Sequence, residues 1–239
     1  MGNNIVERSS LVPHISKDQF DDVATEFLTE YCPEALTHPM AVPIVTIARK
    51  KMGLRIVAEY RLSEDFSIYG QICFNSGLVP VYFKDEDEFR DIKVRRGTIL
   101  IDPDTLKERN IGCLNNTVAH ECVHWYKHRK YHMYNLGAGN AKGVAFRYPK
   151  IERNVALQEQ WTDEDWMEWQ ANNIAPRILM PKQTVGKAFQ MVLDRSKENS
   201  FVSAGLVSKG KWVIEQFAGF YQVSKQSAAI RLQELGYLS

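Results

Sequence analysis

The residues with the clearest capacity for chemistry are two histidines and a glutamate in an HExxH sequence: His120, Glu121 and His124. On a helix, positions i and i+4 lie on one face, so both imidazoles can point at a single metal ion. Glu121 directly follows the first histidine, which places its carboxylate beside a water on the ion rather than on the ion itself. This arrangement is typical of a zinc hydrolase whose glutamate acts as a general base.

A catalytic zinc site usually has three protein ligands and one position left for water, so a third ligand must come from elsewhere in the chain. The next predicted helix offers Glu164 and Glu168, and we favour Glu168. Asn172 lies one turn later, where its side-chain oxygen can accept a hydrogen bond from the distal nitrogen of a ligating histidine. The alternatives for the third ligand are Glu164, Glu152 and Glu159.

A helix must carry the HExxH sequence if its two histidines are to share a face. Apolar residues recur at helical spacing from position 114, and Asn115 or Asn116 can cap the start of this helix. Residues 131–160 then contain several glycines and little periodicity. We expect a long excursion there rather than a compact element, and long loops are often functional.

A second helix must bring the third ligand to the histidines. It is expected to begin after Thr162, which can form a capping box with Asp165, and to run to about residue 175. Pro176 then ends or kinks the helix, because proline lacks the amide hydrogen that a helix interior uses. Glu168 lies in the first half of this helix.

The chain before the HExxH helix is first helical and then rich in β-forming residues. An amphipathic helix is expected over 16–31, capped by Ser16, and a second one over 41–52, closed by Gly53. The acidic stretch 84–91 is expected to be a solvated loop. Four β-rich runs lie between turn signals, at 55–62, 67–75, 78–83 and 93–101.

Helices also dominate the end of the chain. Two are expected near 183–195 and 211–219, and a last one from Ser224 to about Leu235. The last two resemble a helix-turn-helix, which can bind DNA. Residues 208–239 hold four basic and two acidic side chains, a small excess for phosphate binding, so we expect no nucleic-acid partner.

The composition is that of an ordinary globular protein. Of 239 residues, 30 are Lys or Arg and 29 are Asp or Glu, so the net charge of +1 gives no broad attraction for nucleic acid or anionic lipid. No apolar run reaches the ~18 residues of a membrane span. The first ten residues lack a signal-peptide core, and the four cysteines form no CxxC pair, so we expect a cytoplasmic protein without a membrane partner.

Two separated motifs together resemble the ImmA/IrrE family of metallopeptidases. The family has a small β-rich region, a helix with HExxH, and a helix reading roughly ExxANxxAxxLLMP. The corresponding stretch at 168–181 reads EWQANNIAPRILMP, and residues 47–54, IARKKMGL, are similar to the family's entry helix. The resemblance extends from about residue 40 to the end of the chain.

The resemblance implies a zincin-like α+β fold, in which a small twisted sheet packs against the helices that carry HExxH and the third-ligand glutamate. It implies that His120, His124 and Glu168 bind Zn²⁺ and that Glu121 is the base. It also implies a substrate class, because family members cleave or otherwise inactivate helix-turn-helix repressors of mobile elements or stress responses.

We divide the chain into an N-terminal helical extension at 1–40, a zincin-like metallopeptidase domain at 41–207, and helix-turn-helix-like helices at 208–239 that pack on the core. The insert at 131–160 distinguishes the chain from compact family members. Covering the cleft, shaping substrate choice and gating activity are the open interpretations of this insert.

Two other functions use the same residues. A non-catalytic regulator would hold zinc structurally and bind a repressor or DNA through the C-terminal helices, with Lys225 and Arg231 contacting phosphates. A metal hydrolase with a substrate other than a peptide shares every site residue named above.

Several other residues near the two motifs could have either a functional role or a role in packing. His128 and His132 continue the face that His124 begins and can stabilise an oxyanion, but packing is favoured for both. Cys122 points away from the ligand face and is interpreted as core. Three tryptophans favour a packed aromatic patch over a peptide-binding wall: Trp161, Trp166 and Trp169.

Overall fold

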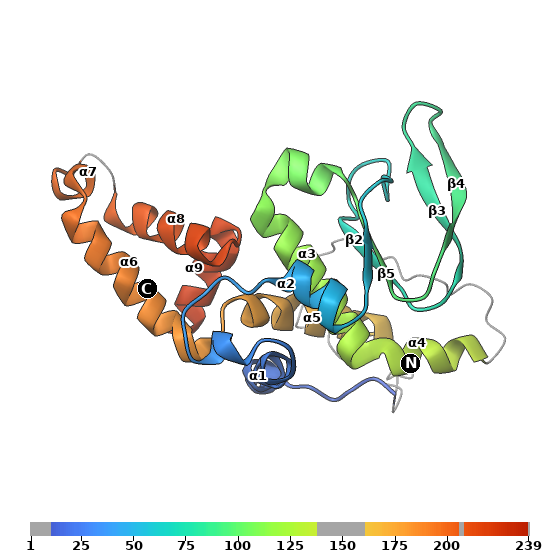
Figure 1. Ribbon diagram of the computed structural model, residues 1–239, viewed down its shortest axis with the longest axis horizontal. Helices are drawn as coiled ribbons and strands as arrows, with labels where there is room; N and C mark the ends of the chain where they lie inside the picture. Colours follow the sequence, from blue (N-terminus) through green and yellow to red (C-terminus); the bar gives the residue numbers. More distant parts are fainter. Residues whose placement is uncertain (1–10, 138–160, 206–207, 239) are drawn as a thin grey trace, which may run out of the picture.

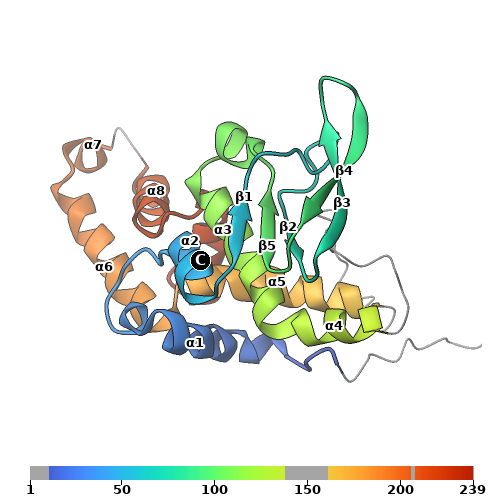
Figure 2. The same ribbon diagram turned by 45° about the vertical axis from the view of Figure 1, so that its right-hand side comes forward.

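Helices and a small sheet both form, so the mixed α+β class expected from the sequence is confirmed (Figures 1 and 2). The structure is a computed structural model that describes residues 11–137, 161–205 and 208–238. Within these ranges we find no helix that combines the length and the apolar character needed to cross a membrane.

The N-terminal part folds as its apolar spacing predicts. After the turn η1 (Lys17–Gln19), helix α1 (Phe20–Tyr31) buries the expected stripe of Phe20, Val23, Ala24, Phe27 and Leu28. The second predicted helix is shorter and divided. It follows the turn η2 (Pro33–Leu36) and consists of α2 (Ile44–Thr46) and the π-helical turn η3 (Ile47–Lys51). Gly53 closes it in the left-handed region, with φ of 69°.

Among the described residues, five strands form two sheets. They are β1 (Arg55–Val57), β2 (Gly70–Cys73), β3 (Gly77–Phe83), β4 (Glu88–Val94) and β5 (Thr98–Ile101). The larger sheet has the order β1-β5-β2, in which β1 is parallel and β2 antiparallel to the fully buried β5. Strands β3 and β4 form a separate hairpin.

The prediction of a solvated loop at 84–91 is wrong for its second half. Strand β4 begins at Glu88 and pairs along its whole length with β3, so that Phe83 lies opposite Glu88. Its side chains are mostly exposed, and only Val94 is buried. An acidic sequence is compatible with a strand whose faces meet water, because the ladder bonds come from the backbone.

The helix with the HExxH sequence begins earlier than predicted. Helix α3 (Ile111–Val123) follows the π-helical turn η4 (Thr105–Arg109), and its cap is Asn110, whose side chain accepts a hydrogen bond from the Cys113 amide at 3.0 Å. Asn115 is instead inside the helix and donates to the Gln222 carbonyl at 3.0 Å. Residue 110 can cap because its backbone is extended, whereas Asn115 and Asn116 are helical.

The chain stays helical after the HExxH sequence, although a long irregular excursion was expected from residue 131. The π-helical turn η5 (His124–His128) continues into α4 (Arg129–Gly137), which covers the first residues of the predicted insert. The rest of the insert, 138–160, lies outside the described residues, and so do the possible ligands Glu152 and Glu159.

Helix α5 (Asp163–Leu179) starts as predicted. Thr162 and Asp165 form the capping box, with the Asp165 amide donating to Thr162 Oγ1 at 3.2 Å and the Thr162 amide donating to Asp165 Oδ2 at 2.9 Å. The predicted end at residue 175 is wrong, because the helix passes through Pro176. Arg177 Nη1 donates to the Asn173 carbonyl at 2.6 Å and so bonds a backbone oxygen near the proline.

Four helices complete the chain: α6 (Lys182–Glu198), α7 (Ser200–Ser203), α8 (Lys209–Tyr221) and α9 (Lys225–Glu234). Ser224 caps α9 as predicted, because its Oγ accepts from the Ser227 amide at 3.0 Å. In both ribbon views the strands gather at one end of the molecule and α6 to α8 at the other, with α3 and α5 between them (Figures 1 and 2).

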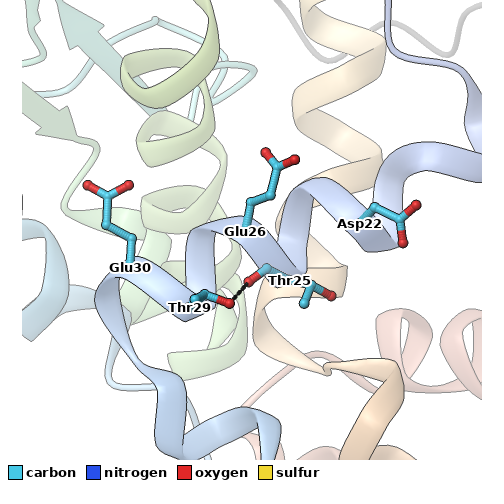
Figure 3. A pocket seen from close by; sticks show the side chains of 5 residues that line it. All are labelled: Asp22, Thr25, Glu26, Thr29 and Glu30. Carbon is cyan, nitrogen blue, oxygen red and sulfur yellow. Dashed lines mark hydrogen bonds between the residues drawn. The ribbon is translucent and has the colours of Figure 1, made fainter.

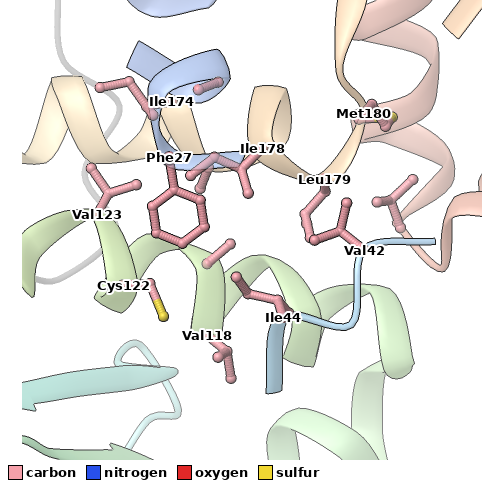
Figure 4. Packing of buried hydrophobic residues seen from close by; sticks show 14 of the residues in the cluster. Phe27, Val42, Ile44, Val118, Cys122, Val123, Ile174, Ile178, Leu179 and Met180 are labelled. Carbon is pink, nitrogen blue, oxygen red and sulfur yellow. The ribbon is translucent and has the colours of Figure 1, made fainter. Parts of the chain in front are cut away.

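One hydrophobic core joins residues from all three ranges into which we divided the sequence. Phe27 of α1, Val118 of α3, Ile178 of α5 and Phe217 of α8 all belong to it. Figure 4 shows the Phe27 ring lying between α3 and α5. The N-terminal helix and the C-terminal helices therefore help to hold the two helices that carry the candidate site.

Candidate metal centre

Three side chains from two helical segments meet at one point. His120 lies in the last turn of α3, His124 begins η5, and Glu168 comes from α5. The Nε2 atoms of the two histidines are 2.9 Å apart. The Glu168 carboxylate lies 3.3 Å from His120 Nε2 and 3.1 Å from His124 Nε2. The three ligand atoms lie within 4.8 Å of one another, so this group can hold a metal ion. We call it the metal-binding group.

The pKa values of Glu168 and His120 are shifted by their neighbours in this group. Burial on its own would raise the pKa of Glu168, but the adjacent imidazoles of His124 and His120 hold it well below its usual range. Burial on its own would lower the pKa of His120, but the charge and hydrogen bond of Glu168 raise it above the usual value. The carboxylate is therefore ionised and available to a cation.

Glu121 lies beside this group and is buried. Its side chain is 6% exposed, and burial raises its pKa, against the opposing effect of His120 and His124. A hydrogen bond from the Ile72 backbone, in β2, holds the carboxylate. Glu121 is not one of the three residues whose ligand atoms converge.

Strand β2 reaches Glu121 closely because residue 70 is a glycine. A Cβ atom at Gly70 would clash with the Thr117 methyl group and would lie 3.3 Å from Glu121 Oε1. Gly70 was not among the residues predicted for the site. A glycine inside a β-rich run, here 67–75, is a signal of close approach and could have indicated it.

Each histidine of the metal-binding group has a different polar neighbour. The Asn172 side chain makes a hydrogen bond to the His120 ring, at the place where the sequence put a supporting residue. Asn172 itself is exposed, and the side chains of His120 and Glu168 are 15% and 14% exposed, so solvent reaches the metal-binding group.

His124 has a buried partner that the sequence analysis interpreted as packing. Its Nδ1 lies 3.0 Å from Nδ1 of His128, and Nε2 of His128 lies 2.9 Å from Oε1 of Gln170. Gln170 Nε2 in turn donates to the Pro13 carbonyl at 2.8 Å. His128 and Gln170 are both fully buried, and burial holds the pKa of His128 well below its usual range.

The remaining candidates lie outside the metal-binding group. Glu164 accepts a hydrogen bond from the Tyr131 hydroxyl at 3.0 Å. The His132 ring stacks on Phe74 with ring centroids 4.0 Å apart, and burial lowers its pKa to about 3. Cys122 is buried in the core, and burial raises the pKa of its thiol. The three tryptophans form the expected aromatic patch, with centroid distances of 4.8 to 5.7 Å: Trp161, Trp166 and Trp169.

A hollow along α1 is separate from the metal-binding group. Figure 3 shows the polar side chains that line it, on successive turns of the helix: Asp22, Thr25, Glu26, Thr29 and Glu30. Glu26 is paired with Lys127 at 2.9 Å, and Asp22 with Lys182 at 3.3 Å. These contacts tie α1 to η5 and α6 at the surface.

A second buried polar cluster involves the end of α5. Arg231 is 2% exposed and pairs through both Nη atoms with the Asp21 carboxylate, while its Nε donates to the Met180 carbonyl at 3.1 Å. Arg177 pairs with Glu234 at 3.0 Å. We call these four side chains the arginine cluster: Asp21, Arg177, Arg231 and Glu234.

No protein-family model matches this chain, and no curated protein matches it. Function is therefore inferred from the geometry and chemistry of the metal-binding group and its surroundings.

Proposed function

We propose that this chain is a zinc-dependent endopeptidase of the ImmA/IrrE type, with a zincin-like fold. Its proposed substrate is a helix-turn-helix transcriptional repressor in the cytoplasm, in the regulation of a mobile element or a stress response. The observation that carries the proposal is the convergence of His120, His124 and Glu168, with the carboxylate of Glu121 beside them.

The spacing of the donors supports zinc. Ligands placed tetrahedrally at about 2.0 Å from zinc lie about 3.3 Å from one another. The measured separations among His120, His124 and Glu168 are 2.9, 3.1 and 3.3 Å, close to that value. Two imidazole nitrogens and one carboxylate oxygen are a ligand set of catalytic zinc sites, which keep a fourth position open.

The protonation of Glu121 supports hydrolysis. When bound, zinc supplies Lewis acidity, which polarises a carbonyl group and makes water more acidic. Glu121 takes the proton that water loses as its oxygen bonds to the peptide carbon. The carboxyl group then gives this proton to the amine as the C–N bond breaks. A raised pKa suits both steps, because the group must accept the proton and release it again near neutral pH.

The arginine cluster argues against the alternative function, that of a regulator which binds DNA through Lys225 and Arg231. Arg231 would have to reach a phosphate, but its guanidinium is buried against Asp21 and the Met180 carbonyl. Lys225, the other basic residue of that alternative, is paired with Glu215. These contacts favour the enzyme over the DNA-binding regulator.

The test is to compare the wild type with Glu121→Gln and with the matched control Glu164→Gln. Each purified, zinc-supplied protein is incubated with helix-turn-helix repressors and with a mixed peptide library, and cleavage is followed by mass spectrometry. We expect about one zinc per chain in all three proteins, and loss of cleavage by at least about 10²-fold in Glu121→Gln alone. Equal cleavage by the wild type and Glu121→Gln would overturn the mechanism, and cleavage of other substrates only would overturn the repressor assignment.

A further inference from the structure

A chain of buried hydrogen bonds leads from the metal-binding group to the N-terminal arm, residues 11–16. It runs from His124 Nδ1 to His128 Nδ1 over 3.0 Å, and from His128 Nε2 to Gln170 Oε1 over 2.9 Å. It ends where Gln170 Nε2 donates to the Pro13 carbonyl at 2.8 Å. None of these three residues is more than 4% exposed, so water does not compete for these bonds.

The Pro13 carbonyl, at the end of this hydrogen-bond path, determines where each proton along the path lies. A carbonyl only accepts, so Gln170 must turn its NH₂ group to Pro13 and its oxygen to His128. That oxygen also only accepts, so the proton of His128 is on Nε2. A neutral His128 then accepts at Nδ1, and the proton of His124 must be on Nδ1. The Nε2 atom of His124 is left with a lone pair.

His128 is neutral because of its surroundings. It is 0% exposed, and its two ring nitrogens face an imidazole and an amide rather than a carboxylate. An unpaired charge at such a position is costly.

We propose that His128 and Gln170, anchored on the Pro13 carbonyl, are positioning residues that fix the tautomer of His124 so that its Nε2 lone pair faces the metal ion. This inference deepens the proposed function and rests on its metal centre, although it does not depend on which bond is hydrolysed. We call the path from His124 to Pro13 the tautomer relay.

The relay makes the N-terminal arm a part of the metal centre. Val12 is fully buried in a small cluster with Tyr131 of α4 and Met167 of α5. This packing holds the neighbouring Pro13 carbonyl against Gln170. The arm belongs to the range 1–40, which the sequence analysis set apart from the metallopeptidase domain.

The test uses two substitutions at Gln170 with opposite consequences for the relay. Gln170→Met has nearly the same shape but accepts no strong hydrogen bond, so the tautomer of His124 is no longer fixed. Gln170→Glu keeps an acceptor for His128 Nε2 but loses the donor to Pro13. A purely structural role for Gln170 predicts that Glu is at least as harmful as Met, because Glu adds a buried charge.

The measurements are zinc affinity by chelator competition, the visible absorption spectrum of the Co²⁺ form, and ¹⁵N chemical shifts of the histidine rings with zinc bound. We expect Gln170→Met to weaken zinc binding about 10- to 100-fold, the usual effect of losing the support of a ligand. We expect Gln170→Glu to stay within about threefold of the wild type and to retain the Co²⁺ spectrum and the Nδ1-protonated tautomer of His124. A metal on Nε2 of His124 leaves the ring proton on Nδ1, so His128 Nδ1 must still accept even when a carboxylate faces its Nε2.

A matched control separates these effects from general destabilisation. Thr184→Val also removes buried hydrogen bonding from a side chain to the backbone, since Thr184 Oγ1 lies 3.1 Å from the Ala35 carbonyl and 3.5 Å from the Pro181 carbonyl. We expect it to bind zinc like the wild type. Equal weakening in both Gln170 variants, or wild-type affinity in Gln170→Met, would overturn the relay while leaving the proposed function intact. A wild type that binds neither zinc nor Co²⁺ would overturn both.

Discussion

Two buried polar clusters share helix α5, and they differ in how their charges are balanced. The arginine cluster, at the end of α5, contains two guanidinium groups and two carboxylates, so its charges cancel within the protein. The metal-binding group, nearer the start of α5, combines the carboxylate of Glu168 with two imidazoles and lies beside the buried Glu121.

The difference separates a structural cluster from a chemical one. Buried charges are costly unless they are paired, and the arginine cluster pairs all of its own. The metal-binding group gains from a divalent cation, because its donors are two nitrogen lone pairs and an ionised carboxylate. We therefore expect the arginine cluster to control the stability of the fold and the metal-binding group to control its response to zinc.

The largest expected effect is that of Arg231→Met. Removing this guanidinium leaves the half-buried Asp21 carboxylate, whose side chain is 19% exposed, with a weaker partner, Arg177 Nε at 3.6 Å. Losing one partner of a buried pair costs about 3–5 kcal/mol, which lowers Tm by roughly 10 °C in a chain of this size. Thermal unfolding measures the effect, and the exposed Lys225→Met is the control that should leave Tm unchanged. If the two variants had the same Tm, the arginine cluster would not be structural.

The next largest expected effect is the gain in folding stability when zinc binds. A ligand that binds the folded state stabilises it by about 2.7 kcal/mol when its free concentration is 100 times its Kd. We expect this gain, reversed by a chelator, in both the wild type and Arg231→Met, and we expect Glu168→Ala to lose most of it. Unfolding in urea with buffered zinc measures the gain. An undiminished gain in Glu168→Ala would remove Glu168 from the metal-binding group.

The metal-binding group was predictable from sequence because its signals are local. His120 and His124 are four positions apart on one helix, and the capping box at Thr162 fixes the start of the helix that carries Glu168. The chemistry of a zinc hydrolase then restricts the choice of third ligand to a few carboxylates.

The supporting contacts could not be predicted in the same way. Gln170 and Pro13 are 157 positions apart, and Arg231 and Asp21 are 210 apart. The periodicity of a helix shows which residues are buried, but it does not show which polar group from a distant segment meets them. His128 and Arg231 were therefore interpreted as a packing residue and a possible DNA contact.

The smallest effect we expect is a pH dependence that arises next to the arginine cluster. Burial raises the pKa of Tyr221 to about 12, against an opposing effect of Arg231. In the unfolded chain tyrosine titrates near 10. Between these values the unfolded state loses the proton and the folded state keeps it, so stability falls as the pH rises. At pH 11 the loss is about 1 kcal/mol.

The measurement is urea unfolding of the wild type and Tyr221→Phe at pH 9 and pH 11. Other groups titrate alike in both proteins, so the wild type should lose about 1 kcal/mol more than the variant. The extra loss should be larger in the Arg231→Met background, because the guanidinium that favours the tyrosinate is gone. It should not depend on zinc, since Tyr221 belongs to the core near α9 and not to the metal-binding group. An extra loss that zinc abolished would show that the two clusters on α5 are coupled rather than independent.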